Sequence, residues 1–294
     1  MDETAKIDCV GLVSPGSMGA AVGKALVARG LRVVAVLGGR TAATRERAGQ
    51  AGIEEVDDLD ALVSSSDVVL SIVPPGVAVE VATTLADAIR TTGVSPVVVD
   101  ANAVSTGTAG RIAAAICASG ARFVDASIIG GPPAPGRTTA MYVSGEGAES
   151  LARQLATPEL AVTWLGPRPT AASALKMCYA AWTKGTSALL LSIRALARAE
   201  GVEEALVDEW ARSQPDVLRR SEAATRVAGR AWRWVAEMEE IGRSFEDVAL
   251  PAGAAQRVAV ELDPASARRL AAAIVSALDG EETPPGSPAQ RASL

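Results

Sequence analysis

TAASALKMCYAAWTKGTSALLLSIRALARAE, residues 170–200, is the stretch that decides how this chain is organised. It contains no proline, and its one glycine is Gly185. Such a stretch can form a helix of about 30 residues, roughly 45 Å long at 1.5 Å per residue. Before it the chain alternates short apolar segments with helical ones, whereas after it we find only helical patterns. We therefore expect a long helix that joins two domains.

Lys176 and Lys184, two of only four lysines in the chain, lie in this segment. A lysine that is desolvated in a cleft can lose its proton near neutral pH, which an arginine does not do. At 100° per residue, one helix face carries Lys176, Ala180, Thr183 and Ser187, with Tyr179 and Lys184 on its flanks. The helix alone does not distinguish a catalytic lysine from two surface lysines of an amphipathic helix.

Composition and charge narrow the functional classes. The chain has 294 residues, enough for two domains, and an apolar fraction of 49%, which is typical of a globular protein. Its net charge of −6 argues against general nucleic-acid binding. Histidine is absent, which removes Ser-His-Asp and Cys-His nucleophilic schemes and most catalytic metal sites. We therefore predict no metal site and expect acid–base chemistry from Lys, Glu, Asp, Tyr or Cys.

The cysteines and the apolar runs indicate a compartment. Cys9, Cys117 and Cys178 are odd in number and widely spaced, so neither a disulfide framework nor a zinc site is indicated. No apolar run approaches the ~18 residues of a membrane span, and the charged N-terminus lacks the apolar core of a signal peptide. We expect a reduced, cytoplasmic protein that does not enter a membrane.

A glycine-containing turn near the N-terminus predicts a dinucleotide site. Residues 7–14 form an apolar run, residues 20–29 have a helical pattern, and Ser14-Pro15-Gly16-Ser17-Met18-Gly19 lies between them. This is the dinucleotide fingerprint with its first glycine replaced by serine. Gly16 lets the backbone approach a pyrophosphate, Gly19 lets the helix pack close to the strand, and the helix N-terminus offers amides to the phosphates.

The end of the second strand indicates which dinucleotide is bound. The strand at 31–37 has no acidic residue after it as far as Thr44, where an NAD-binding unit usually holds the ribose hydroxyls with an acid. Arg40, Thr41 and Arg45 are instead available to a 2′-phosphate, so we predict NADP as the cofactor. The alternative is an ordinary helix capped by Thr41, with solvated arginines.

Alternating strands and helices continue to about residue 165, which predicts a parallel sheet with crossover helices. Cofactor and substrate should then lie outside the carboxyl ends of the strands, where Val73, Pro74, Asn102 and the N-terminal turn gather. After the long helix we predict helices at 203–212, 215–227, 231–247 and 264–278. We expect Trp210, Trp232 and Trp234 to fill gaps between these helices. The proline-rich tail, residues 281–294, is expected to be disordered.

Four segments in order give the chain a family resemblance: 11–19 (GLVSPGSMG), 125–131 (DASIIGG), 166–176 (GPRPTAASALK) and 238–241 (MEEI). The chain to about residue 278 resembles the β-hydroxyacid dehydrogenase superfamily, which includes 3-hydroxyisobutyrate dehydrogenase, 6-phosphogluconate dehydrogenase and the imine reductases. The resemblance implies an α/β chain with a Rossmann NADP-binding domain at 1–167 and an all-helical domain at 168–280. It also implies a homodimer formed through the helical domain, with the long helix between the domains.

The resemblance also implies the residues of the reacting end. Lys176 matches the family's catalytic lysine, a general acid–base that protonates the carbonyl oxygen during reduction. The substrate-contacting positions that match are Asn102, Ser127, Ile129, Gly130, Gly131, Tyr179, Thr183, Glu239 and Glu240. Three of these regions depart from the family: Ile129 replaces a serine that holds a carboxylate, Ala180 replaces an asparagine, and Glu239-Glu240 replace a Lys-Asp pair.

We therefore expect an NADP(H)-dependent oxidoreductase that interconverts a carbonyl and an alcohol on a small molecule. The departures predict a substrate whose reacting end is neutral or cationic, such as a ketone that bears an amine, and not a simple 3-hydroxy acid. Glu239 or Glu240 would pair with the amine, unless both are solvated helix residues. The alternatives are an imine reductase of the same fold, which the retained lysine disfavours, and a dinucleotide-binding sensor without turnover.

Overall fold

The computed structural model describes residues 6–227 and 234–248. The chain divides into two compact units, the first formed by residues 1–181 and 236–253 and the second by 182–235 and 254–294. The long helix α7 (Ala171–Ala199) thus contributes to both units. The domain boundary expected between residues 167 and 168 remains a prediction. The helix predicted at 264–278, Trp232 and the tail at 281–294 lie outside the described residues.

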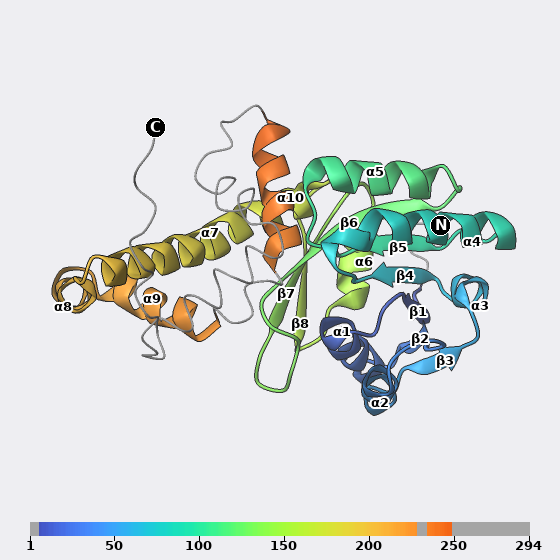
Figure 1. Cartoon of the computed structure of the whole chain (residues 1–294). Helices are drawn as coiled ribbons and strands as arrows, with labels where there is room; N and C mark the ends of the chain where they lie inside the picture. The colour runs from blue at the N-terminus through green and yellow to red at the C-terminus, as the bar shows by residue number, and fades with distance from the viewer. Residues whose placement is uncertain (1–5, 228–233, 249–294) are drawn as a thin grey trace, which may run out of the picture. The chain divides into compact units, whose positions relative to one another are not determined.

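The first unit is built on an eight-stranded sheet with the order β3-β2-β1-β4-β5-β6-β7-β8 (Figure 1). Neighbouring strands run parallel except for β6 and β7, which are antiparallel. The strands are β1 (Cys9–Leu12), β2 (Arg32–Val36), β3 (Glu54–Val56), β4 (Val68–Ser71), β5 (Val97–Asp100), β6 (Arg122–Ile129), β7 (Thr139–Ser144) and β8 (Leu160–Trp164). The order reverses between β1 and β4, which is the switch point where α/β sheets bind ligands.

Alternate residues of each strand point to opposite sides of the sheet, and an apolar cluster covers each side, so both faces are buried. Val33 and Ala35 belong to one apolar cluster with residues of α1 and α6, whereas Val34 belongs to the other cluster with α3, α4 and α5. The helices of this unit are α1 (Ser17–Ala28), α2 (Ala42–Gln50), α3 (Leu59–Ser64), η1 (Pro75–Val77), α4 (Ala78–Thr92), α5 (Thr106–Cys117), α6 (Ala148–Leu155) and α10 (Val235–Glu246). The unit is therefore a doubly wound Rossmann domain, as predicted.

The second unit is helical over its described residues. It contains the C-terminal part of α7 with α8 (Glu203–Ser213) and α9 (Pro215–Val227). Arg194 of α7 holds the other two helices, because it pairs with Glu203 at 2.6 Å and donates to Ser221 Oγ at 3.3 Å. Trp210 is buried, as predicted, while Trp234 is partly exposed. Over the described residues, the structure has no helix both long and apolar enough to span a membrane.

The predicted elements match the structure closely, with three differences. Strand β3 and helix α3 were not predicted, because they are three and six residues long and β3 begins with two glutamates. The apolar run at 122–126 predicts a strand that ends at Ala126, whereas β6 extends to Ile129 because its last residues pair with β7. The predicted helix at 231–247 is observed as α10 within the described residues.

Candidate active site

The turn after β1 has the close packing that a dinucleotide fingerprint requires. A Cβ atom at Gly19 would lie 2.3 Å from the backbone oxygen of Ser14, so only glycine fits there. Around Gly16, by contrast, a Cβ atom would meet no atom within 4 Å. Gly16 caps α1 without a side-chain hydrogen bond, and the first turn of α1 holds no acidic residue. Pro15 is buried, whereas Ser17 is exposed. The N-terminal amides of α1 are therefore suited to a phosphate.

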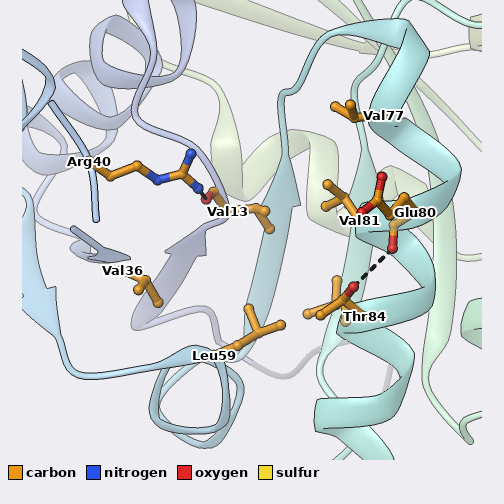
Figure 2. Close-up of a pocket in the computed structure, with 9 residues that line it drawn as sticks. Val13, Val36, Arg40, Leu59, Val77, Glu80, Val81 and Thr84 are labelled. Carbon is orange, nitrogen blue, oxygen red and sulfur yellow. Dashed lines mark hydrogen bonds between the residues drawn. The ribbon is translucent and has the colours of Figure 1, made fainter. Parts of the chain in front are cut away.

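A cavity of about 430 Å³ lies beside this turn, between the end of β2 and helix α4 (Figure 2). Its walls are largely apolar, with Val13 and Val36 on the sheet side and Val77 and Val81 on the α4 side. Arg40 lines it as well and donates from Nη2 to the backbone oxygen of Val13 at 3.5 Å. Largely apolar walls with a few polar or charged groups at the edge are typical of small-molecule sites.

The three residues predicted to hold a 2′-phosphate differ in their hydrogen bonds and in their exposure to solvent. Arg40 and Arg45 are exposed. Thr41 is the N-cap of α2, and its hydroxyl oxygen accepts from the backbone N–H of Thr44 at 3.3 Å. The capping interaction that we considered as the alternative is thus present at Thr41. It leaves the two arginines as the cations available at this end of the site.

Asn102 connects two neighbouring strand ends. Its Oδ1 accepts from the backbone N–H of Val73 at 2.6 Å, and its Nδ2 donates to Ser71 Oγ and to Asp100. Because Asn102 is buried, these contacts hold the segment of Val73 and Pro74 against the end of β5. Its role in contacting substrate or cofactor stays a prediction.

Lys176 lies at the end of β6 and opposite α10. Its ammonium donates to the backbone oxygen of Ile128 at 2.9 Å and lies 3.8 Å from Glu237 Oε1. The side chains of Lys176 and Glu237 are 17% and 13% exposed, so the pair is screened from water without being sealed off. A half-buried ammonium with a carboxylate beside it can donate a proton and stabilise a developing negative charge.

The residues before and after Ile128 form the edge of this region. Ser127 is fully buried, and within the described residues its Oγ has no hydrogen-bond partner. Ile129 is partly exposed, and Gly130 and Gly131 are exposed at the start of the connection to β7. Gly130 has a φ of 115°, which strongly favours glycine. Arg137, which sequence reasoning did not select, lies beside Gly131 and donates to the backbone oxygen of Pro132.

The other predicted positions on α7 are placed unevenly. Tyr179 is exposed, whereas Ala180 is buried one turn after Lys176. Thr183 and Lys184 belong to the second unit. Their part in the site stays a prediction.

The two glutamates predicted to meet an amine have different surroundings. Glu239 is exposed. Glu240 is buried, accepts from the backbone N–H of Ser105 at 2.7 Å and pairs with Arg243. Glu240 therefore caps the start of α5, while Glu237, which sequence reasoning missed, is the glutamate that reaches Lys176. No local signal in the sequence distinguishes Glu237 from the neighbouring glutamates, because its contact with Lys176 joins residues 61 positions apart.

Sequence reasoning also missed a pair of buried acids. Asp100 and Asp125 are register partners on β5 and β6. Burial, with the charge of Asp125 beside it, raises the pKa of Asp100 to about 7, and burial raises the pKa of Asp125 against the effect of its hydrogen bonds. In the sequence, Asp100 ends an expected strand and Asp125 begins the 125–131 segment, and neither position signals that the acid is buried.

Comparison with known families agrees with this geometry. The fold and the site define a member of the β-hydroxyacid dehydrogenase superfamily. Residues 7–161, more than half of the chain, match the NAD binding domain of 6-phosphogluconate dehydrogenase, and the chain belongs to this family. Residues 197–263 match a domain of unknown function (DUF1932), and residues 247–287 match a family of unknown function (DUF6295). A search of curated proteins gives no match.

Three solved structures illustrate the likeness. The conserved protein MTH1747, described as similar to 3-hydroxyacid dehydrogenases, is 28% identical with a TM-score of 0.65, over 90% of this chain and 99% of that one. A 3-hydroxyisobutyrate dehydrogenase from Salmonella typhimurium is 19% identical with a TM-score of 0.70, over 91% and 99%. An imine reductase from Myxococcus stipitatus in complex with NADP⁺ is 18% identical with a TM-score of 0.57, over 86% and 92%. The findings support an oxidoreductase with a nicotinamide dinucleotide site.

Proposed function

We propose that the protein is an NADP(H)-dependent oxidoreductase that interconverts a carbonyl and an alcohol on a small molecule. The observation that carries the proposal is the Lys176 ammonium, which is fixed by the backbone oxygen of Ile128 at 2.9 Å and accompanied by Glu237 at 3.8 Å. A reduced nicotinamide supplies a hydride when it is bound. Lys176 supplies the proton to the carbonyl oxygen and takes it back from the hydroxyl in the reverse direction.

The choice of NADP over NAD rests on the adenosine end of the site. Arg40 and Arg45 are exposed and follow a strand with no acid at its end, and Arg40 also lines the apolar cavity. Glu80 also lines the cavity, but it comes from α4 on the far wall (Figure 2). A 2′-phosphate gains charge-assisted hydrogen bonds from guanidinium groups, whereas a 2′-hydroxyl would leave them without a charged partner.

We propose that the substrate is neutral or cationic at its reacting end. Glu237 places a carboxylate beside the proton donor, and both side chains are largely shielded from water, so a second carboxylate there would meet a like charge. An amine next to the carbonyl would instead be attracted. The substrate class is the one expected from the sequence, but the carboxylate that would attract the amine is Glu237 and not Glu239 or Glu240.

An imine reductase of the same fold is the second candidate, and Glu237 is the observation that favours it. A carboxylate close to the reacting carbon stabilises a cationic iminium as well as an amine. Consumption of NADPH separates the candidates when it is followed first with ketones and aldehydes, then with cyclic imines. Turnover with carbonyls that is lost in Lys176→Ala supports the leading proposal, and turnover with imines alone supports the second. No turnover, with dinucleotide binding intact, would favour the non-catalytic sensor.

We also propose a homodimer formed through the helical region. Trp182, Leu189 and Leu196 of α7 are spaced by seven residues and are 58%, 52% and 61% exposed, which is a large apolar stripe for a single chain. The double variant Leu189→Glu with Leu196→Glu should shift the mass measured by light scattering from that of a dimer to that of a monomer. A wild-type protein that is already monomeric at micromolar concentration would contradict the proposal.

A further inference from the structure

A buried carboxylate joins strand β6 to the first turn of α7. Asp125 is 1% exposed. Its Oδ2 accepts from the backbone N–H of Ser173 at 2.9 Å and from Ser144 Oγ at 3.0 Å, and its Oδ1 accepts from Ser173 Oγ at 2.5 Å. The donors in these three hydrogen bonds are Ser173 of α7, which donates twice, and Ser144 of β7.

Ser144 of β7 extends the same attachment by one residue. Its Oγ accepts from the backbone N–H of Ala172 at 3.0 Å while donating to Asp125. Amides in the first turn of a helix have no partner inside the helix, and a negative charge is favourable at this end. Thr170, just before the helix, is the non-glycine residue with positive φ, 62°, in the described part of the chain. The sharp turn at Thr170 and the two acceptors together fix where α7 begins.

This attachment lies one helical turn before Lys176. Ser173 and Lys176 are three residues apart, so their side chains lie on the same side of α7, about 4.5 Å apart along its axis. Lys176 then returns to β6, where it contacts the backbone oxygen of Ile128, three residues after Asp125. One strand thus fixes both the start of the helix and the ammonium that it carries. A slide or rotation of the first turn would move that ammonium away from Ile128 and Glu237.

We propose that Asp125, with Ser144 as its link to Ala172, is a positioning residue that sets the location of the Lys176 ammonium. The inference rests on the role proposed for Lys176, but its geometric half does not depend on turnover. Asp100 provides the contrast within the structure. It is equally buried and pairs in register with Asp125, yet its side chain bonds to Asn102 and not to α7.

Kinetics of matched variants test the catalytic half. Asp125→Ala removes both carboxylate oxygens that accept from Ser173 and Ser144, so kcat should fall by about 10- to 100-fold, the usual effect of misplacing a catalytic group by about 1 Å. The KM for NADPH should stay within about threefold, because the adenosine cavity is lined by other elements. Asp125→Asn should restore most of kcat, since its amide oxygen can accept from Ser173 N–H and its NH₂ can donate to Ser173 Oγ.

A control separates positioning from loss of stability. Ile116→Ala empties a fully buried position in α5, within the apolar cluster that contains no residue of α7. It should leave a cavity and lower the midpoint of urea unfolding, while kcat per folded molecule stays near that of the wild type. Equal losses of kcat in Asp125→Ala and Ile116→Ala, or a normal kcat in Asp125→Ala, would overturn the proposal.

Spectroscopy tests the geometric half without any substrate. The four lysines can be reductively methylated with ¹³C, and Lys→Arg substitution assigns each lysine signal and distinguishes it from that of the N-terminal amine. Asp125→Ala and the milder Ser144→Ala should shift or broaden the Lys176 signal and leave those of Lys6 and Lys24 in place. Ser144→Ala decides the question if Asp125→Ala does not fold. An unchanged Lys176 signal in both folded variants, or in Ser144→Ala alone, would overturn the positioning role, whereas shifted signals in a protein without turnover would refute only the proposed reaction.

Discussion

The two ends of the site are built in different ways. At the adenosine end, the turn at residues 14–19 and the arginines at 40 and 45 lie within about thirty residues of one another, and their function depends on backbone amides and surface cations. At the proposed reacting end, Ile128, Lys176 and Glu237 come from three distant parts of the chain, where the Lys176 side chain meets a backbone oxygen and one carboxylate. A local motif therefore defines the first end, whereas only the folded chain defines the second.

The largest expected effect tests the reacting end. Lys176→Ala should lower kcat by ~10²–10⁴, the usual contribution of a positioned acid–base group, while the dissociation constant for NADPH stays the same. Lys184→Ala is the matched control on the same helix and should change kcat by less than about threefold, because it lies about 80° around from Lys176. Near-normal turnover by Lys176→Ala would mean that Lys176 does not supply the proton at the reacting end.

The second largest effect concerns the free energy of unfolding and depends on Asp100, the last residue of β5. The pKa of Asp100 is raised from 3.8 to about 7, so the folded protein holds a proton that the unfolded chain has released. Asp100 should therefore stabilise the fold most at low pH and lose this contribution as pH rises from about 4 to about 7, by up to about 4 kcal/mol.

The difference between wild type and Asp100→Asn isolates this contribution. Urea unfolding at several pH values should show a free energy of unfolding for the wild type that falls, relative to Asp100→Asn, from pH 4.5 to pH 7.5. A difference that is flat across this range would mean that Asp100 is ionised throughout, with its charge compensated in the fold.

The adenosine end gives the third effect. Arg40→Ala should raise the KM for NADPH about 10- to 100-fold, because a charge-assisted pair contributes about 1.5–3 kcal/mol, and should hardly change the KM for NADH. Arg47, on the same helix as Arg45 but only partly exposed, is the control for loss of a positive charge. Equal use of NADPH and NADH by the wild type would contradict the assignment of the arginines.

The smallest effect concerns the choice of substrate. Glu237→Gln removes the negative charge beside Lys176 and should raise kcat/KM for a substrate with a carboxylate by about tenfold relative to its neutral analogue, a difference of about 1.4 kcal/mol. Glu239→Gln is the matched control, because Glu239 is exposed two residues away. The same change of ratio in both variants would mean that general surface charge sets the preference.

The contrast between a local motif and contacts across the chain also explains which features could be predicted from the sequence. Gly19 is needed where a Cβ atom would collide with Ser14, and the strands at 97–100 and 122–126 follow from apolar runs, so local chemistry was enough to predict the alternating strands and the dinucleotide turn. The extension of β6 to Ile129 depends on its pairing with β7 and was not predicted. Glu237 was missed because nothing local distinguishes it from Glu239 and Glu240. Asp125 was quoted as part of a motif, but its attachment to Ser173 depends on a contact across 48 residues.

The most direct test of the account follows the hydride. The wild-type protein would be incubated with NADPH that carries deuterium at both C4 positions of the nicotinamide and with matched ketones that carry an amine, no charge or a carboxylate. The products would then be weighed by mass spectrometry. The account predicts deuterium on the former carbonyl carbon of the amine-bearing and neutral substrates, with labelled product nearly lost in Lys176→Ala. Absence of deuterium from every product of the wild type, or equal labelling by Lys176→Ala, would contradict it.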